Sequence, residues 1–226
     1  MEYQKLIDLL FTQRDEKYSE FNKKIVNTQI KIVGVRSPAL GKIIKQLKKD
    51  NVDPSAWKWH DYLEVDFLIA SMMLSHLKTV EEKYAFIGEF LKETDNWAVV
   101  DSLSGGFSIS DFSIGLKWIK KFSVSKYPFV RRFAYVHALN NFAQKENLSE
   151  IFKVMKPDEH YYVRMGQAWL LAECFLEDPV ATEAFLKENP LDDWTINKAI
   201  SKIHDSFRVS SETKEYLKKY RRSRKS

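Results

Sequence analysis

The part of the sequence with the clearest chemical potential is residues 96–102, which contain Trp97 and Asp101. These two residues are four positions apart, so in a helix their side chains share one face and can meet. A carboxylate beside an indole can stabilise a positive charge that develops close to it. The alternative is an exposed acid near a helix end and a tryptophan in the core, so the pair alone does not define a site.

Two adjacent arginines, Arg131 and Arg132, stand near the start of a later expected helix. Neighbouring residues point about 100° apart around a helix, so only one of the two can face a given ligand. An arginine there can hold a phosphate through two parallel hydrogen bonds, or it can orient Asp101. The alternative is a structural salt bridge between neighbouring repeats.

The spacing of further candidates predicts a row of residues on one surface. Asp101, Arg132 and Trp169 are separated by 31 and 37 residues, and Lys198 and Lys202 follow about one interval later. If the chain is a stack of repeats of this length, equivalent positions lie side by side. The apolar residues around Trp169 also allow a position in the core.

Helical periodicity dominates the sequence, and alternating strand patterns are nearly absent. The six prolines fall between the expected helices or at their starts, where they do not break a hydrogen-bond ladder. Gly166 lies inside a periodic stretch and costs about 1 kcal/mol relative to alanine, which predicts the close approach of a neighbour. The expected helices span residues 3–11, 37–49, 60–77, 79–92, 96–103, 108–122, 128–144, 148–155, 159–176, 180–187, 193–207 and 211–222, with the fifth stopped by Ser104-Gly105-Gly106.

Pairs of these helices begin near residues 60, 96, 128, 159 and 193, at intervals of 31 to 36 residues. Such a period is typical of helical-hairpin repeats that stack and bury a continuous apolar spine. We therefore expect an all-α superhelix with a concave basic face, formed by one repeat domain over residues 1–213. An irregular all-α bundle is the alternative. Residues 214–226 form a basic C-terminal tail, which is expected to fray after Leu217 because no apolar stripe follows.

Charge is segregated along the chain, although the net charge is only +5. Residues 21–49 contain eight basic residues, residues 112–145 contain seven, and neither stretch contains an acid. The tail adds seven basic residues against one acid. This distribution favours a basic side suited to a polyanion, with Lys120 and Lys121 among its contacts. Solvated helix faces with scattered charges are the alternative.

Several classes of protein and site are not expected. Cys174 is the single cysteine, so neither a disulfide framework nor a cysteine-based zinc site is predicted, and the five histidines lack metal-ligand spacing. No metal or cofactor is therefore expected. The sequence has no signal-peptide pattern and no apolar stretch approaching the roughly 20 residues that span a bilayer. A cytoplasmic monomer without membrane contact is expected.

Together, the order and spacing of four short motifs resemble those of the HEAT-like-repeat DNA alkylation repair proteins, the AlkD-type alkylpurine DNA glycosylases. The resemblance extends from about Tyr3 to Ile203. The motifs are Gly34-Val35-Arg36-Ser37-Pro38, Trp97-x-x-x-Asp101, Phe129-Val130-Arg131-Arg132-x-Ala134 and the helix that contains Trp169.

The resemblance implies a DNA glycosylase that binds double-stranded DNA along its concave face. By this likeness, Trp97 and Trp169 line a cleft beside the lesion, Asp101 is the catalytic carboxylate and Arg132 holds the DNA backbone. The family's substrates are cationic N3- and N7-alkylpurines. The further basic residues predicted to contact DNA are Arg131, Lys198, Lys202, Lys120 and Lys121.

One segment departs from the family pattern. In the glycosylases an N-terminal helix contacts DNA near the lesion, whereas here residues 15–33 are short and Asn27-Thr28-Gln29 interrupts their helical pattern. The chain therefore resembles a branch in which that helix is reduced. A non-catalytic binder of damaged or branched DNA and a protein-interaction scaffold remain alternatives, because fold alone does not decide function.

Overall fold

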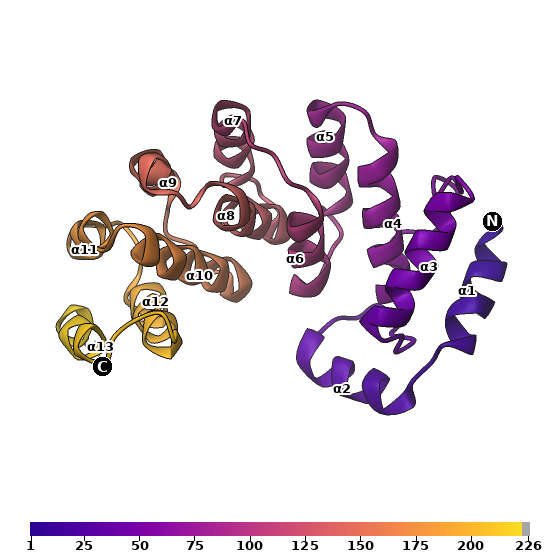
Figure 1. The fold of residues 1–226 in the computed structure, drawn as a ribbon, viewed down its shortest axis with the longest axis horizontal. Coiled ribbons are helices and arrows are strands. Elements are labelled where there is room, and N and C mark those ends of the chain that lie inside the picture. The colour runs from indigo at the N-terminus through magenta and orange to yellow at the C-terminus, as the bar shows by residue number, and fades with distance from the viewer. Residues whose placement is uncertain (223–226) are drawn as a thin grey trace. The chain divides into compact units, whose positions relative to one another are not determined.

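The computed structural model describes residues 1–222, and all regular structure within them is helical (Figure 1). The all-α class is confirmed, and the arrangement is compatible with a superhelix of helical repeats. The helices are α1 (Tyr3–Thr12), α2 (Glu16–Val26), α3 (Ser37–Lys49), α4 (Leu63–His76), α5 (Val80–Phe90), α6 (Trp97–Gly106), α7 (Phe112–Phe122), α8 (Pro128–Phe142), α9 (Leu148–Val154), α10 (Tyr161–Glu177), α11 (Pro179–Lys187), α12 (Asp193–Asp205) and α13 (Ser211–Leu217), with two 3-10 helices, η1 (Lys145–Asn147) and η2 (Lys218–Tyr220).

The chain divides into two compact units, which are described separately. Unit 1 is Met1–Phe107 and unit 2 is Ser108–Ser226. Unit 1 therefore contains α1 to α6, and unit 2 contains α7 to α13. Within the described residues, no helix combines the length and the apolar character that crossing a membrane requires.

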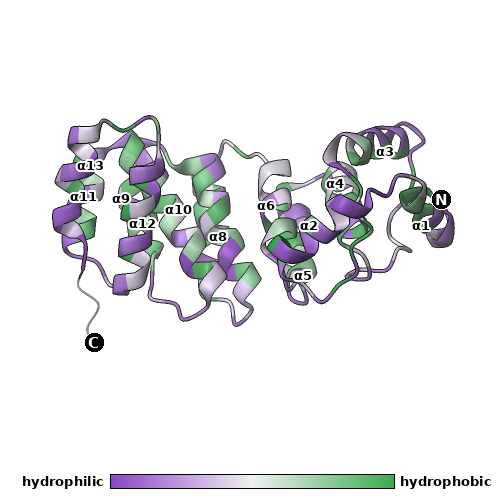
Figure 2. Cartoon of the chain, turned by 90° about the horizontal axis from the view of Figure 1, so that it is seen from below, coloured by the Kyte–Doolittle hydropathy of each residue, from purple (hydrophilic) through white to green (hydrophobic). Residues whose placement is uncertain are grey.

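Unit 1 is built around α4, which contacts α3, α5 and α6. Its side chains are buried on nearly every side, with Leu63, Val65, Leu68 and Met72 at most 1% exposed. A helix surrounded in this way has no need of a polar face, unlike a helix at the edge of a unit. The edge helix α1 has a green and a purple side in Figure 2, because it buries one apolar stripe and exposes the other side to solvent.

A buried carboxylate shapes the turn that precedes α3. Glu64 of α4 accepts hydrogen bonds from the backbone N–H groups of Val33, Gly34 and Val35, at 3.0, 2.7 and 3.2 Å. Gly34 has a φ of +96°, and a Cβ at that position would lie 2.6 Å from the backbone oxygen of Asp15. The glycine is therefore required by both backbone conformation and space, which explains the start of the motif at residues 34–38.

In unit 2, α10 packs between α8 and α12. The helices α7, α9 and α11 form a second row, since α9 contacts both α7 and α11 while α7 packs on α8 and α11 on α10. Figure 1 shows these two rows of helices in unit 2. This arrangement is compatible with stacked helical hairpins, with one helix of each pair in the row of α8, α10 and α12, which is called the inner row below.

Several expected helix boundaries were wrong: the helix expected at residues 108–122 begins at Phe112, and the one expected at residues 211–222 ends as an α-helix at Leu217. The helix expected at residues 60–77 begins at Leu63, because His60 adopts a φ of 58° and its backbone N–H donates to the side-chain carboxylate of Asp66 in α4. The helix expected to stop at Ser104 continues through Gly106. Ser104 and Phe107 are both buried, so packing holds the last turn in place despite the two glycines.

The C-terminal segment does not fray over the part that the structure describes. The Arg222 backbone N–H and carbonyl both bond the side-chain amide of Asn197 in α12, at 2.9 Å each. The hydroxyls of Tyr216 and Tyr220 donate to Glu183 in α11. The expectation of a frayed tail was therefore wrong for residues up to Arg222, because tyrosines and polar contacts replace an apolar stripe. Residues 223–226 of the predicted tail lie outside the described residues.

Candidate functional site

Helix α6 presents Trp97 and Asp101 one turn apart, and both side chains are half-buried. The opposite side of the helix is anchored by Val99, Val100 and Leu103, which are completely buried. This anchoring fixes the rotation of α6 and leaves the Trp97–Asp101 face at the surface of unit 1. The tryptophan is therefore not a core residue, and the expected sharing of one face by the two side chains is observed.

The indole of Trp97 is tied to the end of α2. Its Nε1–H donates to the backbone oxygen of Ile25 at 3.1 Å. Just before α6, the Asp95 carboxylate accepts from the Thr28 hydroxyl at 2.5 Å and from the Gln29 N–H at 2.6 Å. These three hydrogen bonds join α2 to α6, so the break in helical pattern at residues 27–29 is a junction that positions the candidate site.

The two arginines of α8 have different partners. Arg131 forms two hydrogen bonds with Asp158, at 2.6 and 3.0 Å, and its Nη1 donates to the backbone oxygen of Ser125 at 2.8 Å. Arg132 is 5% exposed and donates to the backbone oxygen of Tyr162 in the first turn of α10, at 2.7 Å. Arg131 thus occupies the structural salt bridge between neighbouring repeats, while contact of either residue with DNA stays a prediction.

Gly166 was expected to mark a tight contact, and that expectation was wrong. A Cβ at this position would meet Val136 at 3.6 Å and the Arg132 side chain at 3.7 Å, which are ordinary van der Waals distances. Space alone does not require a glycine at this point of α10.

Trp169 and Lys202 lie together in unit 2. The Lys202 ammonium stands 5.7 Å from the centre of the indole ring, and both residues line a hollow of about 290 Å³ between α10 and α12. Trp169 is half-buried, so part of its side chain lies at the surface and it is not a core residue. Lys198 is one helical turn earlier on α12 and is also partly exposed.

Lys120 and Lys121 lie on α7, in the other row of unit 2. The Lys120 ammonium pairs with Glu150 at 3.3 Å, and the Lys121 ammonium lies 4.4 Å from the centre of the Trp118 ring. The structure therefore does not bring these two lysines together with Arg132, Trp169 and Lys202, which belong to the inner row of α8, α10 and α12. Trp97 and Asp101 belong to unit 1.

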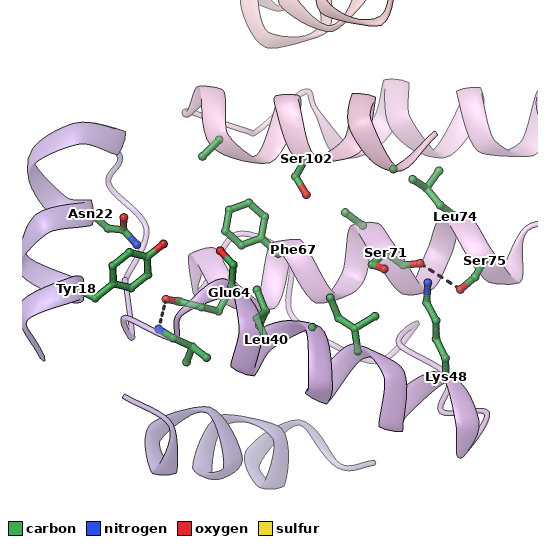
Figure 3. Close-up of a pocket in the computed structure, with 17 residues that line it drawn as sticks. Tyr18, Asn22, Leu40, Lys48, Glu64, Phe67, Ser71, Leu74, Ser75 and Ser102 are labelled. Atoms are coloured by element: carbon green, nitrogen blue, oxygen red, sulfur yellow. Dashed lines mark hydrogen bonds between the residues drawn. The ribbon is translucent and has the colours of Figure 1, made fainter. Parts of the chain in front are cut away.

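A cavity beside α6 was missed by the sequence analysis. It has a volume of about 520 Å³ and lies within unit 1, between α2, α3, α4 and α6 (Figure 3). The α6 wall consists of Ala98, Ser102 and Gly106, each four residues from the next. The available signal was this stripe of small residues, directly adjacent in sequence to Trp97 and Asp101.

Basic side chains around this part of unit 1 are mostly unpaired. Within the described residues, Lys24, Lys42, Lys45, Lys48 and Lys49 are exposed and form no ion pair. Four of them lie on α3, and Lys48 reaches the cavity. This arrangement leaves uncompensated positive charge available to a polyanion.

The remaining reactive side chains do not form a second centre. Burial raises the pKa of the Cys174 thiol to about 12, so it is protonated at neutral pH and a poor nucleophile. In the part of the chain that the structure describes, no three His, Cys, Asp or Glu side chains are grouped so that they could hold a metal ion.

The chain matches the family model described as DNA alkylation repair enzyme over residues 6–203. The protein belongs to the DNA alkylation repair enzyme family. The matched region begins in α1 and ends in α12, so it includes both units and each sequence-predicted site residue. A comparison with curated proteins finds no match. Membership of the DNA alkylation repair family supports a role in alkylation repair, and it confirms the resemblance drawn from the motifs.

Proposed function

We propose that this protein is a DNA glycosylase that binds double-stranded DNA and hydrolyses the N-glycosidic bond of cationic N3- and N7-alkylpurines. The observation that carries the proposal is the Trp97–Asp101 pair in a member of the DNA alkylation repair family. Both side chains are half-buried on one face of α6, and the indole is fixed by the Ile25 carbonyl.

The chemistry suits a carboxylate without a metal. When the bond between the sugar C1′ and the purine nitrogen breaks, the electron pair stays on the nitrogen and neutralises the alkylated base. The sugar is left with oxocarbenium character, which a carboxylate stabilises more strongly in the transition state than in the ground state. Asp101 also accepts a hydrogen bond from the attacking water. The water oxygen bonds to C1′, and the proton that it loses passes to Asp101 and then to solvent, which leaves a neutral sugar hydroxyl at C1′. The indole of Trp97 presents a π face that attracts positive charge.

DNA binding is supported by the charge of both units. The unpaired lysines of α2 and α3 supply phosphate contacts in unit 1, while Arg132, Trp169, Lys198 and Lys202 are the proposed contacts of the inner row in unit 2. Lys120 and Lys121 are proposed as further phosphate contacts on α7. Arg131 acts in this proposal mainly by holding Asp158, since its guanidinium already makes two bonds to that carboxylate.

The deciding experiment measures base release from duplexes that contain N7-methylguanine or N3-methyladenine. Asp101→Asn keeps the size of the side chain and removes its charge, so excision should fall by about 10²-fold or more. Binding to a duplex with an uncleavable abasic analogue should be nearly preserved, because phosphate contacts dominate affinity.

Asp50→Asn is the matched control, since it makes the same chemical change at an exposed carboxylate that contacts only Gln46 among the described hydrogen bonds. Full activity of Asp101→Asn would refute the proposed mechanism. Wild-type protein that binds DNA and releases no base would instead show a non-catalytic binder.

A further inference from the structure

The cavity of unit 1 is not explained by the proposed reaction. Figure 3 shows Tyr18 and Asn22 of α2 at one end, Phe67 of α4 and Ser102 of α6 along its length, and Lys48 of α3 at the opposite end. Its α6 wall lies next to the Trp97–Asp101 face, because Ala98 and Ser102 directly follow these two residues in the helix.

Asn22 presents its side-chain amide to the cavity (Figure 3). Its side chain is 8% exposed and borders the cavity. Among the residues that the structure describes, the amide has no hydrogen-bond partner. The amide oxygen and nitrogen of Asn22 do not belong to the fully buried atoms that lack a hydrogen bond, so solvent in the cavity reaches them. The amide can therefore exchange water for the hydrogen-bonding edge of a ligand that enters the cavity.

Gly41 keeps part of the cavity empty. It lies inside α3 and borders the cavity, and a Cβ at this position would find no heavy atom within 4 Å. Glycine weakens a helix interior relative to alanine, and here no protein neighbour demands it. The free space at Gly41 is thus consistent with room kept for something other than the protein.

The lining indicates the chemistry of the occupant. Tyr18 and Phe67 offer aromatic surface, and Leu40 and Leu74 offer apolar contact. The Glu64 carboxylate also borders the cavity, but it is engaged by three backbone N–H groups and therefore does not define a cation site. Asn22 presents a donor and an acceptor side by side, the pattern that pairs with the edge of a purine. An apolar space with aromatic walls and one amide fits a planar heterocycle with a hydrogen-bonding edge.

We propose that this cavity binds an unpaired nucleobase of a DNA strand, with Asn22 on the edge of the base and Tyr18 or Phe67 against its face. The inference rests on the DNA binding of the proposed function and adds a base-binding site to it. Charge supports a base that is still attached to its strand, since Lys48 borders the cavity and Lys45 and Lys49 continue the same helix without ion pairs.

The test uses the full-length protein and a duplex in which 2-aminopurine stands opposite an abasic-site analogue. An identical duplex with 2-aminopurine paired to thymine is the reference. The wild-type protein should change the fluorescence of the unpaired base and prefer that duplex by about tenfold, the size expected from one stacking contact. Gly41→Leu, which fills the cavity, and Asn22→Leu should each remove the preference and leave binding of the paired duplex unchanged.

Gln46→Leu is the matched control, because Gln46 lies on the same helix and is exposed outside this cavity. Asn22→Leu should also leave the melting temperature nearly unchanged, since the amide makes no hydrogen bond to the part of the protein that the structure describes; a merely structural Asn22 would give a lower melting temperature. The free 2-aminopurine nucleoside should bind much more weakly than the strand, and equal binding would point to a small-molecule site instead.

The inference is overturned if Gly41→Leu keeps the preference for the unpaired base, or if the wild-type protein shows none. Neither result depends on excision, so the two proposals fail separately. Loss of base release in Asp101→Asn with equal binding of both duplexes would leave the glycosylase proposal standing alone. Preference for the unpaired base without any base release would leave the base-binding site standing alone.

Discussion

Both units consist of packed helices, but they differ in the side-chain contacts that the first turns of their helices make. In unit 2, Arg131 and Arg164 are each the fourth residue of their helices, α8 and α10, and each pairs with an acid that precedes the next inner helix. These arginines bond Asp158 at 2.6 Å and Asp192 at 2.5 Å. The fourth residue of α6 in unit 1 is the buried Val100.

Unpaired polar groups occur in both units, since His160, Gln167 and Thr182 of unit 2 also have buried side-chain atoms without a hydrogen bond among the described residues. Unit 1 combines such a group with a cavity. The Asn22 amide borders this cavity without a hydrogen bond to the protein, and the lysines of α3 form no ion pair within the described part of the chain. Under the two proposals, unit 1 provides the Trp97–Asp101 pair and the base-binding cavity, whereas unit 2 provides the arginine–aspartate pairs between neighbouring helices.

The largest effect should come from breaking an inter-repeat pair. Arg131→Ala leaves the Asp158 carboxylate, whose side chain is 8% exposed, without its cation. Removing one partner of a buried pair should lower the free energy of unfolding by about 3 kcal/mol. Arg208→Ala is the control, since the Arg208–Glu173 pair is 61% and 29% exposed, and it should cost less than about 1 kcal/mol. Urea unfolding compares the two variants, and equal losses would contradict the special role of the inter-repeat pair.

The units should also respond to pH in opposite directions. Burial lowers the pKa of His137 in unit 2 from 6.5 to about 3, so its contribution to stability is lost as the pH falls below 6.5. At pH 5 this costs about 2 kcal/mol relative to pH 7. His137→Phe should remove that loss, because phenylalanine does not titrate and keeps the stacking on Phe133. Urea unfolding at both pH values checks this, and an unchanged pH dependence would argue against a neutral buried His137.

In unit 1 the pKa shift of His60 has the opposite direction. Burial acts to lower the pKa of His60, but the hydrogen bond and charge of Asp66 outweigh it, so the net pKa is raised above 6.5. The contribution of the pair is complete below pH 6.5 and declines as the pH rises through the folded-state pKa. His60→Gln should therefore destabilise the protein more at pH 6 than at pH 9. A pH-independent loss would show that only the shape of the turn matters.

A smaller effect concerns the salt dependence of duplex binding. Replacing Lys45 and Lys48 together by glutamine should reduce the slope of log affinity against log salt by about 2, one for each lost phosphate contact. Lys153→Gln should change the slope little, because Lys153 already pairs with Glu150 at 2.5 Å. Titrations at several salt concentrations separate the two, and an unchanged slope in the double variant would remove the lysines of α3 from the DNA-binding surface.

The smallest effect is expected at Gly166. A methyl group fits there at ordinary contact distance from Val136 and Arg132, so Gly166→Ala should raise the free energy of unfolding by up to about 1 kcal/mol. Thermal or urea unfolding measures it. Destabilisation would show that the Arg132 side chain needs more room than the observed distances indicate.

Local signals predicted most of the helices and the shared face of Trp97 and Asp101. Prolines at the starts of helices and the 3.6-residue period are properties of short segments, so the sequence alone exposes them. The boundary at Ser104 was missed because the burial of Phe107, a tertiary effect, outweighed the local preference of two glycines. His60 was assigned to a helix because its bond to Asp66 and positive φ have no local sequence signature.

The contacts that position the candidate site could not be predicted from the sequence for a different reason. Asp95 bonds Thr28 across 67 residues, and Glu64 bonds Gly34 across 30. No periodic pattern encodes which distant residue will meet which turn. The cavity could not be predicted for the same reason, since its walls come from four helices. Its polar residue Asn22 has the sequence context of an ordinary surface residue on a basic helix.

The junction between α2 and α6 also sets an order of events during protein synthesis. The hydrogen bond to the Ile25 carbonyl cannot form until Trp97, which is 72 residues further along the chain, has been synthesised. The bond from Thr28 likewise requires Asp95. A ribosome adds residues at about 5–20 per second, so these partners emerge several seconds after α2. Until then, the C-terminal end of α2 lacks the bonds that fix it beside α6. Chains stalled before Asp95 should therefore be cleaved by protease near residues 25–29, whereas chains released beyond Phe107 should be protected there.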